Sequence, residues 1–173
     1  MPPGAGESIS FVSHTVKRHF LLLCIGLAMS TNAPVQVWAT ATSTHQTNGR
    51  VIVFRYIKDF RPGFSKSIQP VRVILAWRYQ SDKGMPALAE RQRMDAMEDA
   101  LEPVLEKDKF ATLALVSTGE NLREWTYYVK SEGEFMTRLN SALSGKPAFP
   151  IEVHVAPDPQ WTTYETFKTG VKG

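Results

Sequence analysis

A change of hydrophobic period between residues 51 and 156 constrains the fold of this chain more than any other feature. In five segments the apolar residues either alternate with polar ones or follow one another without a break, which is typical of strands. These segments are residues 51–57, 71–79, 110–117, 123–130 and 151–155. The chain is therefore expected to build a sheet with at least one face in a core.

Two further segments repeat their apolar residues every three or four positions, as amphipathic helices do. The first covers residues 87–106 and begins after Pro86, which suits the first turn of a helix. Its apolar stripe consists of Leu88, Met94, Met97, Leu101 and either Val104 or Leu105. The second opens with a capping box, Ser131 followed by Glu134, and ends before Gly145.

The elements between residues 71 and 156 follow one another as strand, helix, strand, strand, helix, strand. This order is that of a ferredoxin-like α+β sandwich, in which helices cover one face of a mixed or antiparallel sheet. We expect the strand order 151–155, 71–79, 123–130, 110–117, with the two central strands parallel. Residues 51–57 would add one extra N-terminal strand, at an edge of the sheet or over its open face.

The first 41 residues have the order of a secretory signal peptide. Lys17 and Arg18 precede a ten-residue apolar run at 20–29, and small residues at Ala39 and Ala41 offer cleavage sites. The run is too short to cross a bilayer, which takes about 20 apolar residues. The sequence therefore predicts a periplasmic or secreted protein, and a buried N-terminal helix is the alternative.

Removing residues 1–41 would remove Cys24, the only cysteine, and with it any disulfide, thiol nucleophile or thiolate metal site. A lipoprotein anchor at Cys24 is disfavoured, because Leu22 and Leu23 stand where small residues are needed. The remaining chain has 18 Lys+Arg against 16 Asp+Glu, a balance too even to indicate nucleic-acid or acidic-membrane binding. It divides into a flexible lead-in at 42–49, a single α+β domain at 50–168 and a tail at 169–173.

Three short motifs carry a resemblance to a known family: Gly84-Met-Pro86, Arg123-Glu-Trp-Thr-Tyr-Tyr128 and Asp158-Pro-Gln-Trp161. With these motifs, residues 71–167 resemble the bacterial domain of unknown function 695 (DUF695) family. The resemblance implies a small α/β domain with no established activity. That family is also similar to inhibitors of ribonuclease E, but an exported chain would not meet a cytoplasmic nuclease.

No pattern in the sequence predicts a catalytic residue, a cofactor or a metal site. His154 and Glu152 share one face of a strand, yet a general base also needs a cleft and further partners. Glu98, Glu102 and Glu106 follow at steps of four, and we interpret them as a solvated helix face rather than as cation ligands. Nucleophile-elbow and phosphate-loop motifs are absent, and residues 123–130 lack the glycines of an RNA-binding strand.

The motif Asp158-Pro-Gln-Trp161 opens a short aromatic tail. Asp158 is expected to cap a helical turn. Trp161, Tyr164 and Phe167, at steps of three, are expected to fold back on the core. A ligand-stacking site is the alternative role of the same aromatic residues.

The helix-free face of the predicted sheet is the candidate interaction surface. Alternation brings seven residues to it: Arg72, Ile74, Arg78, Glu124, Tyr128, Glu152 and His154. The expected register sets Arg72 near Glu124 and Arg78 near Glu152, around an apolar centre of Ile74 and Tyr128.

The sequence therefore predicts an exported, non-enzymatic interaction domain of the cell envelope. It would form a homodimer or bind an envelope protein through the helix-free face. A solvated sheet shielded by residues 50–70 is the alternative for that face, and a small enzyme with a shallow site around His154 and Glu152 is the alternative function.

Overall fold

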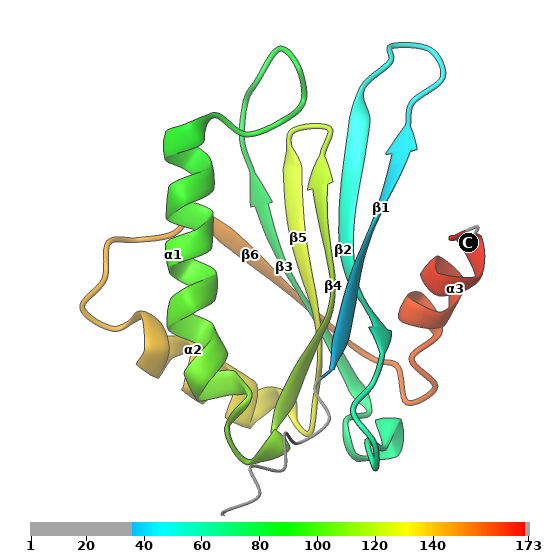
Figure 1. Cartoon of the computed structure of the whole chain (residues 1–173). Coiled ribbons are helices and arrows are strands. Elements are labelled where there is room, and N and C mark those ends of the chain that lie inside the picture. Colours follow the sequence, from blue (N-terminus) through cyan, green and yellow to red (C-terminus); the bar gives the residue numbers. More distant parts are fainter. Residues whose placement is uncertain (1–35, 172–173) are drawn as a thin grey trace, which may run out of the picture. The chain divides into compact units, whose positions relative to one another are not determined.

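A computed structural model of the chain describes residues 36–171. Within them, six strands form one sheet accompanied by three α-helices, so the chain is an α+β protein (Figure 1). The elements are β1 (Val37–Thr44), β2 (Val51–Asp59), β3 (Val71–Arg78), α1 (Leu88–Leu105), β4 (Ala111–Gly119), β5 (Leu122–Val129), α2 (Glu132–Leu143), β6 (Ile151–Pro157) and α3 (Thr162–Gly170), with short 3-10 helices at Lys66–Ile68 and Lys107–Lys109. The charged and apolar parts of the predicted signal peptide, and Cys24, lie outside the described residues.

The sheet has the strand order β1-β2-β4-β5-β3-β6, and every neighbouring pair is antiparallel. Strands β6, β3, β5 and β4 stand in the order expected from the sequence. The two central strands, however, run in opposite directions: Val71 lies opposite Val129, and Arg78 lies opposite Leu122. The prediction that the central strands are parallel is therefore wrong.

The connections between the strands explain why β3 and β5 are antiparallel. α1 returns the chain from the end of β3 to the start of β4, so these two strands run in the same direction. β4 and β5 are joined by the two-residue turn Glu120-Asn121, whose φ angles of 50° and 63° are typical of a tight hairpin. A hairpin reverses the chain, so β5 runs against β4 and also against β3.

The N-terminal part of the domain supplies two strands where the sequence predicted one. β1 and β2 form a hairpin in which Val37–Thr44 is paired along its length. β2 then joins the sheet through β4. Residues 42–44, expected in a flexible lead-in, belong to β1, and so do Ala39 and Ala41. The sheet therefore ends at β1 on one side and at β6 on the other.

The main core lies between the sheet and the helices α1 and α2, which cover the same face (Figure 1). Trp77 of β3 and Trp125 of β5 are fully buried there. The buried side of α1 consists of Met94, Met97, Leu101 and Leu105. The predicted stripe is thus confirmed except at Leu88, which is 61% exposed at the start of the helix.

A second, smaller core lies on the opposite face of the sheet, beneath α3 (Figure 1). Trp161 and Tyr164 pack there against Ile57, Ala114 and Tyr128. The predicted folding back of the aromatic tail is therefore confirmed, and α3 occupies part of the face that was expected to carry no helix. None of the helices in residues 36–171 is long and apolar enough to cross a membrane.

Candidate functional site

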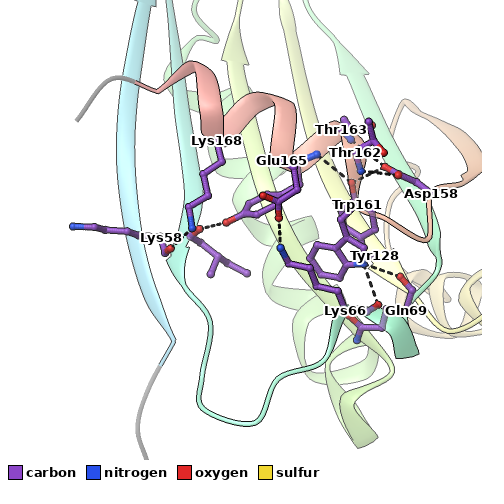
Figure 2. Close-up of polar contacts among 12 residues, drawn as sticks. Lys58, Lys66, Gln69, Tyr128, Asp158, Trp161, Thr162, Thr163, Glu165 and Lys168 are labelled. Atoms are coloured by element: carbon purple, nitrogen blue, oxygen red, sulfur yellow. Dashed lines mark hydrogen bonds and ion pairs between the residues drawn. The ribbon is translucent and has the colours of Figure 1, made fainter.

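Asp158 fixes the start of α3 on the sheet (Figure 2). Its carboxylate accepts hydrogen bonds from the amides of Thr162 at 2.7 Å and Thr163 at 3.1 Å, and from the Tyr128 hydroxyl at 2.9 Å. The same hydroxyl accepts the Tyr164 amide at 3.2 Å. Burial raises the pKa of Asp158, but the hydrogen bonds from the Thr162 and Thr163 amides and from Tyr128 together lower it below its usual value. Asp158 is thus an ionised cap of α3, in agreement with the sequence prediction.

Trp161 closes the contact between α3 and the sheet (Figure 2). Its indole stacks on the Tyr128 ring with centroids 3.8 Å apart, and Nε1 donates to the carbonyl oxygens of Lys66 and Gln69. The residue has a left-handed backbone conformation, φ 57°, that is unfavourable for a large side chain. Both rings are 0% exposed. They therefore support the fold and leave no surface on which a ligand can stack.

The helix-free face is only partly exposed, because α3 lies on it. Tyr128, which the sequence placed at the centre of the exposed surface, is 0% exposed. Arg72, on the neighbouring strand, donates a hydrogen bond from Nη1 to the Thr163 hydroxyl of α3. Both residues take part in attaching α3, and the prediction that Tyr128 is exposed is wrong.

The antiparallel register also changes one of the two expected charge pairs. Arg72 lies opposite Tyr128 and Glu124 lies opposite Ala76, so the predicted proximity of Arg72 and Glu124 is wrong. Arg78 does lie beside Glu152, with Nε 3.4 Å from Oε1. The pair of Arg78 with Glu152 joins β3 and β6, whose pairing does not depend on β5. The expected pair of Arg72 with Glu124 required β5 to run parallel to β3, and β5 runs antiparallel.

A charged strip along β3 and β6 stays exposed on this face. The side chains of Arg78, Glu152 and His154 are 68%, 54% and 57% exposed. His154 Nε2 lies 3.4 Å from Glu152 Oε2, its one charged partner within residues 36–171. Ile74 and Glu124 are half-buried. We call these five residues, Ile74, Arg78, Glu124, Glu152 and His154, the exposed strip.

Around Glu98 of α1, on the other face of the sheet, lies a set of convergent charges that sequence reasoning missed. The Glu98 carboxylate accepts hydrogen bonds from Arg123 Nη2 at 3.2 Å, from Trp125 Nε1 at 2.7 Å and from Arg55 Nη2. Its side chain is only 15% exposed. The interpretation of this helix face as solvated is therefore wrong at Glu98, which links α1 to β2 and β5.

Arg123 is the most buried cation of this network. Its side chain is 10% exposed, with Nη1 3.0 Å from Asp95 and Nη2 bound to Glu98. Nε is buried without a hydrogen-bond partner among residues 36–171. An open groove of about 360 Å³ runs past Arg123, Arg55 and Arg91. The negative charges of Asp95 and Glu98 compensate the positive charges of two of these three arginines. The groove therefore has little excess positive charge to attract an anion.

Glu98 and Glu102 of α1 and Glu106, the residue that follows the helix, line a small hollow against Tyr127 of β5. The volume of this hollow is about 110 Å³. Desolvation and the Glu102 charge raise the pKa of Glu106. Burial, with the Glu98 charge, raises the pKa of the Tyr127 hydroxyl. Among residues 36–171, no group of three His, Cys, Asp or Glu is arranged to hold a metal ion.

A larger open groove, about 840 Å³, lies between β1 and α3. Residues 39–43 of β1 line it, and Ala39 and Ala41 lie opposite Tyr56 and Phe54 of β2, so the groove lies over the face of the β1–β2 hairpin that faces α3. Phe54 and Tyr56 of β2 form its wall with Phe167 of α3, whose ring centroid lies 5.0 Å from Phe54 and 5.2 Å from Tyr56. Sequence reasoning missed this groove, because residues 37–41 were assigned to the signal peptide and not to a strand.

The geometry thus defines a small α+β domain whose two buried carboxylates, Glu98 and Asp158, are paired inside the protein and whose grooves are open to the surface. A model of a family of unknown function (DUF695) matches residues 36–168. The chain belongs to this family, which confirms the predicted membership. The match includes β1 and β2, so it extends further toward the N-terminus than the resemblance over residues 71–167. No curated protein matches the chain, and the similarity to ribonuclease E inhibitors stays a prediction.

Proposed function

We propose that the chain is an exported, non-enzymatic interaction domain of the cell envelope. Export is supported by the succession of positive charge, apolar run and small residues before residue 42. For the domain itself, we take β3–β6 with α1 and α2 as a ferredoxin-like unit that the β1–β2 hairpin extends at one edge. The strand order β6-β3-β5-β4 supports this assignment.

The observation that carries the proposal is that the buried carboxylates are fully engaged inside the protein. Glu98 accepts three side-chain donors, and Asp158 accepts two amides and one hydroxyl. A group that acts on a substrate needs a free donor, acceptor or acid that faces a cleft. The paired Glu98 and Asp158 carboxylates instead hold α1 and α3 against the sheet. This role is consistent with a domain that acts through its surface.

The exposed strip is the proposed contact surface for an envelope protein. It combines charges of both signs, at Arg78, Glu152 and His154, with the half-buried aliphatic side chain of Ile74. Such a composition is typical of the rim of an interface. Because rim charges govern the rate and specificity of association more than its affinity, we expect weak binding that falls with ionic strength. A homodimer through the same strip stays a prediction.

A small enzyme acting through His154 and Glu152 has less support. Both side chains are more than half exposed, and neither lines the grooves beside β1, α1 or α3. An exposed imidazole with one carboxylate partner does not have the enclosed geometry that general base catalysis uses. We therefore retain the interaction domain as the proposed function.

Cross-linking in the cell envelope tests the contact surface. The tagged chain is cross-linked and captured from its host, alongside Arg78→Glu and the matched charge reversal Lys83→Glu in the exposed turn after β3. We expect one protein to be captured with the wild type and with Lys83→Glu, and at least several-fold less with Arg78→Glu. Equal capture by all three chains, or none by any, contradicts the proposal.

Export has a separate test, the N-terminus of the protein recovered from the envelope fraction. Cleavage after Ala39 or Ala41 would leave Thr40 or Thr42 as the first residue, and would remove part of a strand that pairs with β2. Mass spectrometry identifies the first residue directly. An intact N-terminus on a cytosolic protein would end the export proposal.

A further inference from the structure

The hollow between the end of α1 and Tyr127 has an excess of negative charge, and we call it the acidic hollow. Its lining contains the carboxylates of Glu98, Glu102 and Glu106 against one guanidinium group, that of Arg55. Arg55 pairs with Glu98. Within residues 36–171, neither Glu102 nor Glu106 forms an ion pair with a basic side chain. These two carboxylates are therefore the groups that a cation would meet first.

Tyr127 brings a buried hydroxyl without a partner to the acidic hollow. The residue is 2% exposed and belongs to the lining. Its hydroxyl makes no hydrogen bond with any group of residues 36–171, although buried polar groups normally have a partner. Burial and the nearby charges of Glu98, Glu106 and Glu102 raise the pKa of this hydroxyl, so it stays protonated. A polar group from outside the domain is therefore needed to satisfy it.

The chemistry and the size of the acidic hollow favour a small cation with several N–H donors. Ionised carboxylates only accept hydrogen bonds, and a hydroxyl oxygen can accept them as well. Desolvation and the Glu102 charge raise the pKa of Glu106, with Arg61 acting in the opposite direction, so a positive charge here would relieve repulsion. A metal ion fits less well, because residues 36–171 hold no group of three His, Cys, Asp or Glu arranged for one. The volume of about 110 Å³ is that of roughly three or four water molecules, enough for an ammonium group and two or three carbons.

We propose that the acidic hollow binds a primary ammonium group at the end of an alkyl chain. The three N–H donors of the ammonium match three acceptors, the Tyr127 hydroxyl and the carboxylates of Glu102 and Glu106. Both glutamates are exposed, so the rest of the ligand can extend into solvent beside them. The ligand is either a free alkylamine or the side chain of a lysine in another polypeptide.

The proposed acceptors do not depend on the N-terminal strand. Trp38 of β1 also borders the acidic hollow, but the acceptors belong to α1, to the residue after it and to β5. Cleavage after Ala39 or Ala41 would remove Trp38 and leave the acceptors in place. The proposal involves neither export nor the exposed strip, so it can fail or succeed separately from the proposed function.

Titration of the chain purified from its host, followed by NMR, tests the ligand class. The probes are n-butylamine, which is protonated at neutral pH, n-butanol as its neutral counterpart, and calcium chloride. We expect saturable binding of butylammonium and no saturation with butanol or Ca²⁺. Nα-acetyl-lysine amide separates the two sources: affinity equal to that of butylammonium indicates a lysine side chain, and much weaker binding indicates a free amine. No saturable binding of butylammonium, or equal binding of butanol, overturns the proposal.

Two substitutions locate the binding in the acidic hollow. Tyr127→Phe removes only a hydroxyl that bonds nothing in the described domain, and Tyr56→Phe is the same change on the α3 side of the sheet. Glu106→Gln removes one carboxylate charge, and Asp99→Asn does so at an exposed position of α1 outside the hollow. We expect Tyr127→Phe and Glu106→Gln each to weaken butylammonium binding by on the order of tenfold, because each removes a hydrogen bond to a charged group. The two controls should bind as the wild type does. Unchanged binding by both Tyr127→Phe and Glu106→Gln, or an equal loss in the controls, contradicts the site.

Discussion

The two buried carboxylates of this domain, Glu98 and Asp158, are stabilised in different ways. Glu98 receives its donors from side chains of β2 and β5, and two of the three are guanidinium groups. Asp158 receives two of its three donors from backbone amides four and five positions further along the chain. Glu98 therefore depends on the assembled sheet, whereas Asp158 depends mainly on the helix that it caps.

The two faces of the sheet are therefore stabilised by different interactions. On the face covered by α1 and α2, a charge network ties the β1–β2 hairpin to the core through Arg55. On the opposite face, stacked aromatic rings hold α3, and the carboxylate only fixes where the helix starts. Mutations should therefore act through unpaired charge on the first face and through lost apolar packing on the second.

The largest effect is expected on the α3 face, from Trp161→Ala. The substitution removes a fully buried indole that stacks on Tyr128, and should lower the free energy of unfolding by about 4 kcal/mol. Urea unfolding measures the change. Phe167→Ala, at the half-buried end of the same helix, is the control and should cost less. An equal or larger loss for Phe167→Ala would show that α3 is not held mainly by its first turn.

Glu98→Ala is expected to have the next largest effect, about 3 kcal/mol, because it leaves Arg123 buried without its shared carboxylate. Asp95→Ala removes the other partner of Arg123, but Asp95 is 54% exposed, so the loss there should stay within about 1 kcal/mol. Chemical denaturation of both variants gives the comparison. Similar losses at the two positions would contradict the view that burial makes Glu98 the central group.

Asp158→Asn should destabilise the domain by about 2 kcal/mol at neutral pH, because the amide group cannot accept both backbone N–H donors as a carboxylate does. The pKa of Asp158 is lowered in the folded protein. Its contribution is therefore full above the unfolded pKa, near 4, and is lost as the pH falls through the folded value. The gap between wild type and variant, measured by urea unfolding from pH 7 to pH 3, should narrow below about pH 4. A gap independent of pH would mean that Asp158 is not ionised in its cap.

Much of the fold could be predicted because periodicity reports burial. The strands β3 to β6 and the stripe of α1 follow directly from alternation and from steps of three and four. β1 was missed because six of its eight residues are Ala, Ser or Thr, and because small residues also mark a cleavage site. The direction of β5 was recoverable: a two-residue turn after β4 requires a hairpin, and β4 returns in the direction of β3.

The site was harder to predict, since its residues come from separate elements. Arg123 alternates inward with Trp125 and Tyr127, and a charge on that side of a strand calls for a buried partner. Glu98 lies four residues after Met94 and borders the apolar stripe of α1. This position was a second indication of a buried charge pair. The burial of Tyr128 could have been predicted by combining two expectations, that α1 and α2 cover one face of the sheet and that the aromatic tail folds back on the core. With the first face occupied by α1 and α2, the tail packs on the opposite face, which carries Tyr128.

The smallest effect is expected at Arg78, whose ion pair with Glu152 lies outside both cores. Arg78 pairs with one carboxylate and Arg123 with two, and their side chains are 68% and 10% exposed. Arg78→Ala should change the free energy of unfolding by about 0.5 kcal/mol or less, because water and salt screen an exposed pair. Arg123→Ala, the same substitution at the buried site, should cost about 3 kcal/mol, since it leaves Glu98 without one of its two arginines in a desolvated position. Thermal unfolding in low and high salt measures both, and salt should weaken only the Arg78 contribution. A loss at Arg78 as large as that at Arg123 would mean that the exposed strip helps to hold the fold, which would remove the reason for assigning it to a partner.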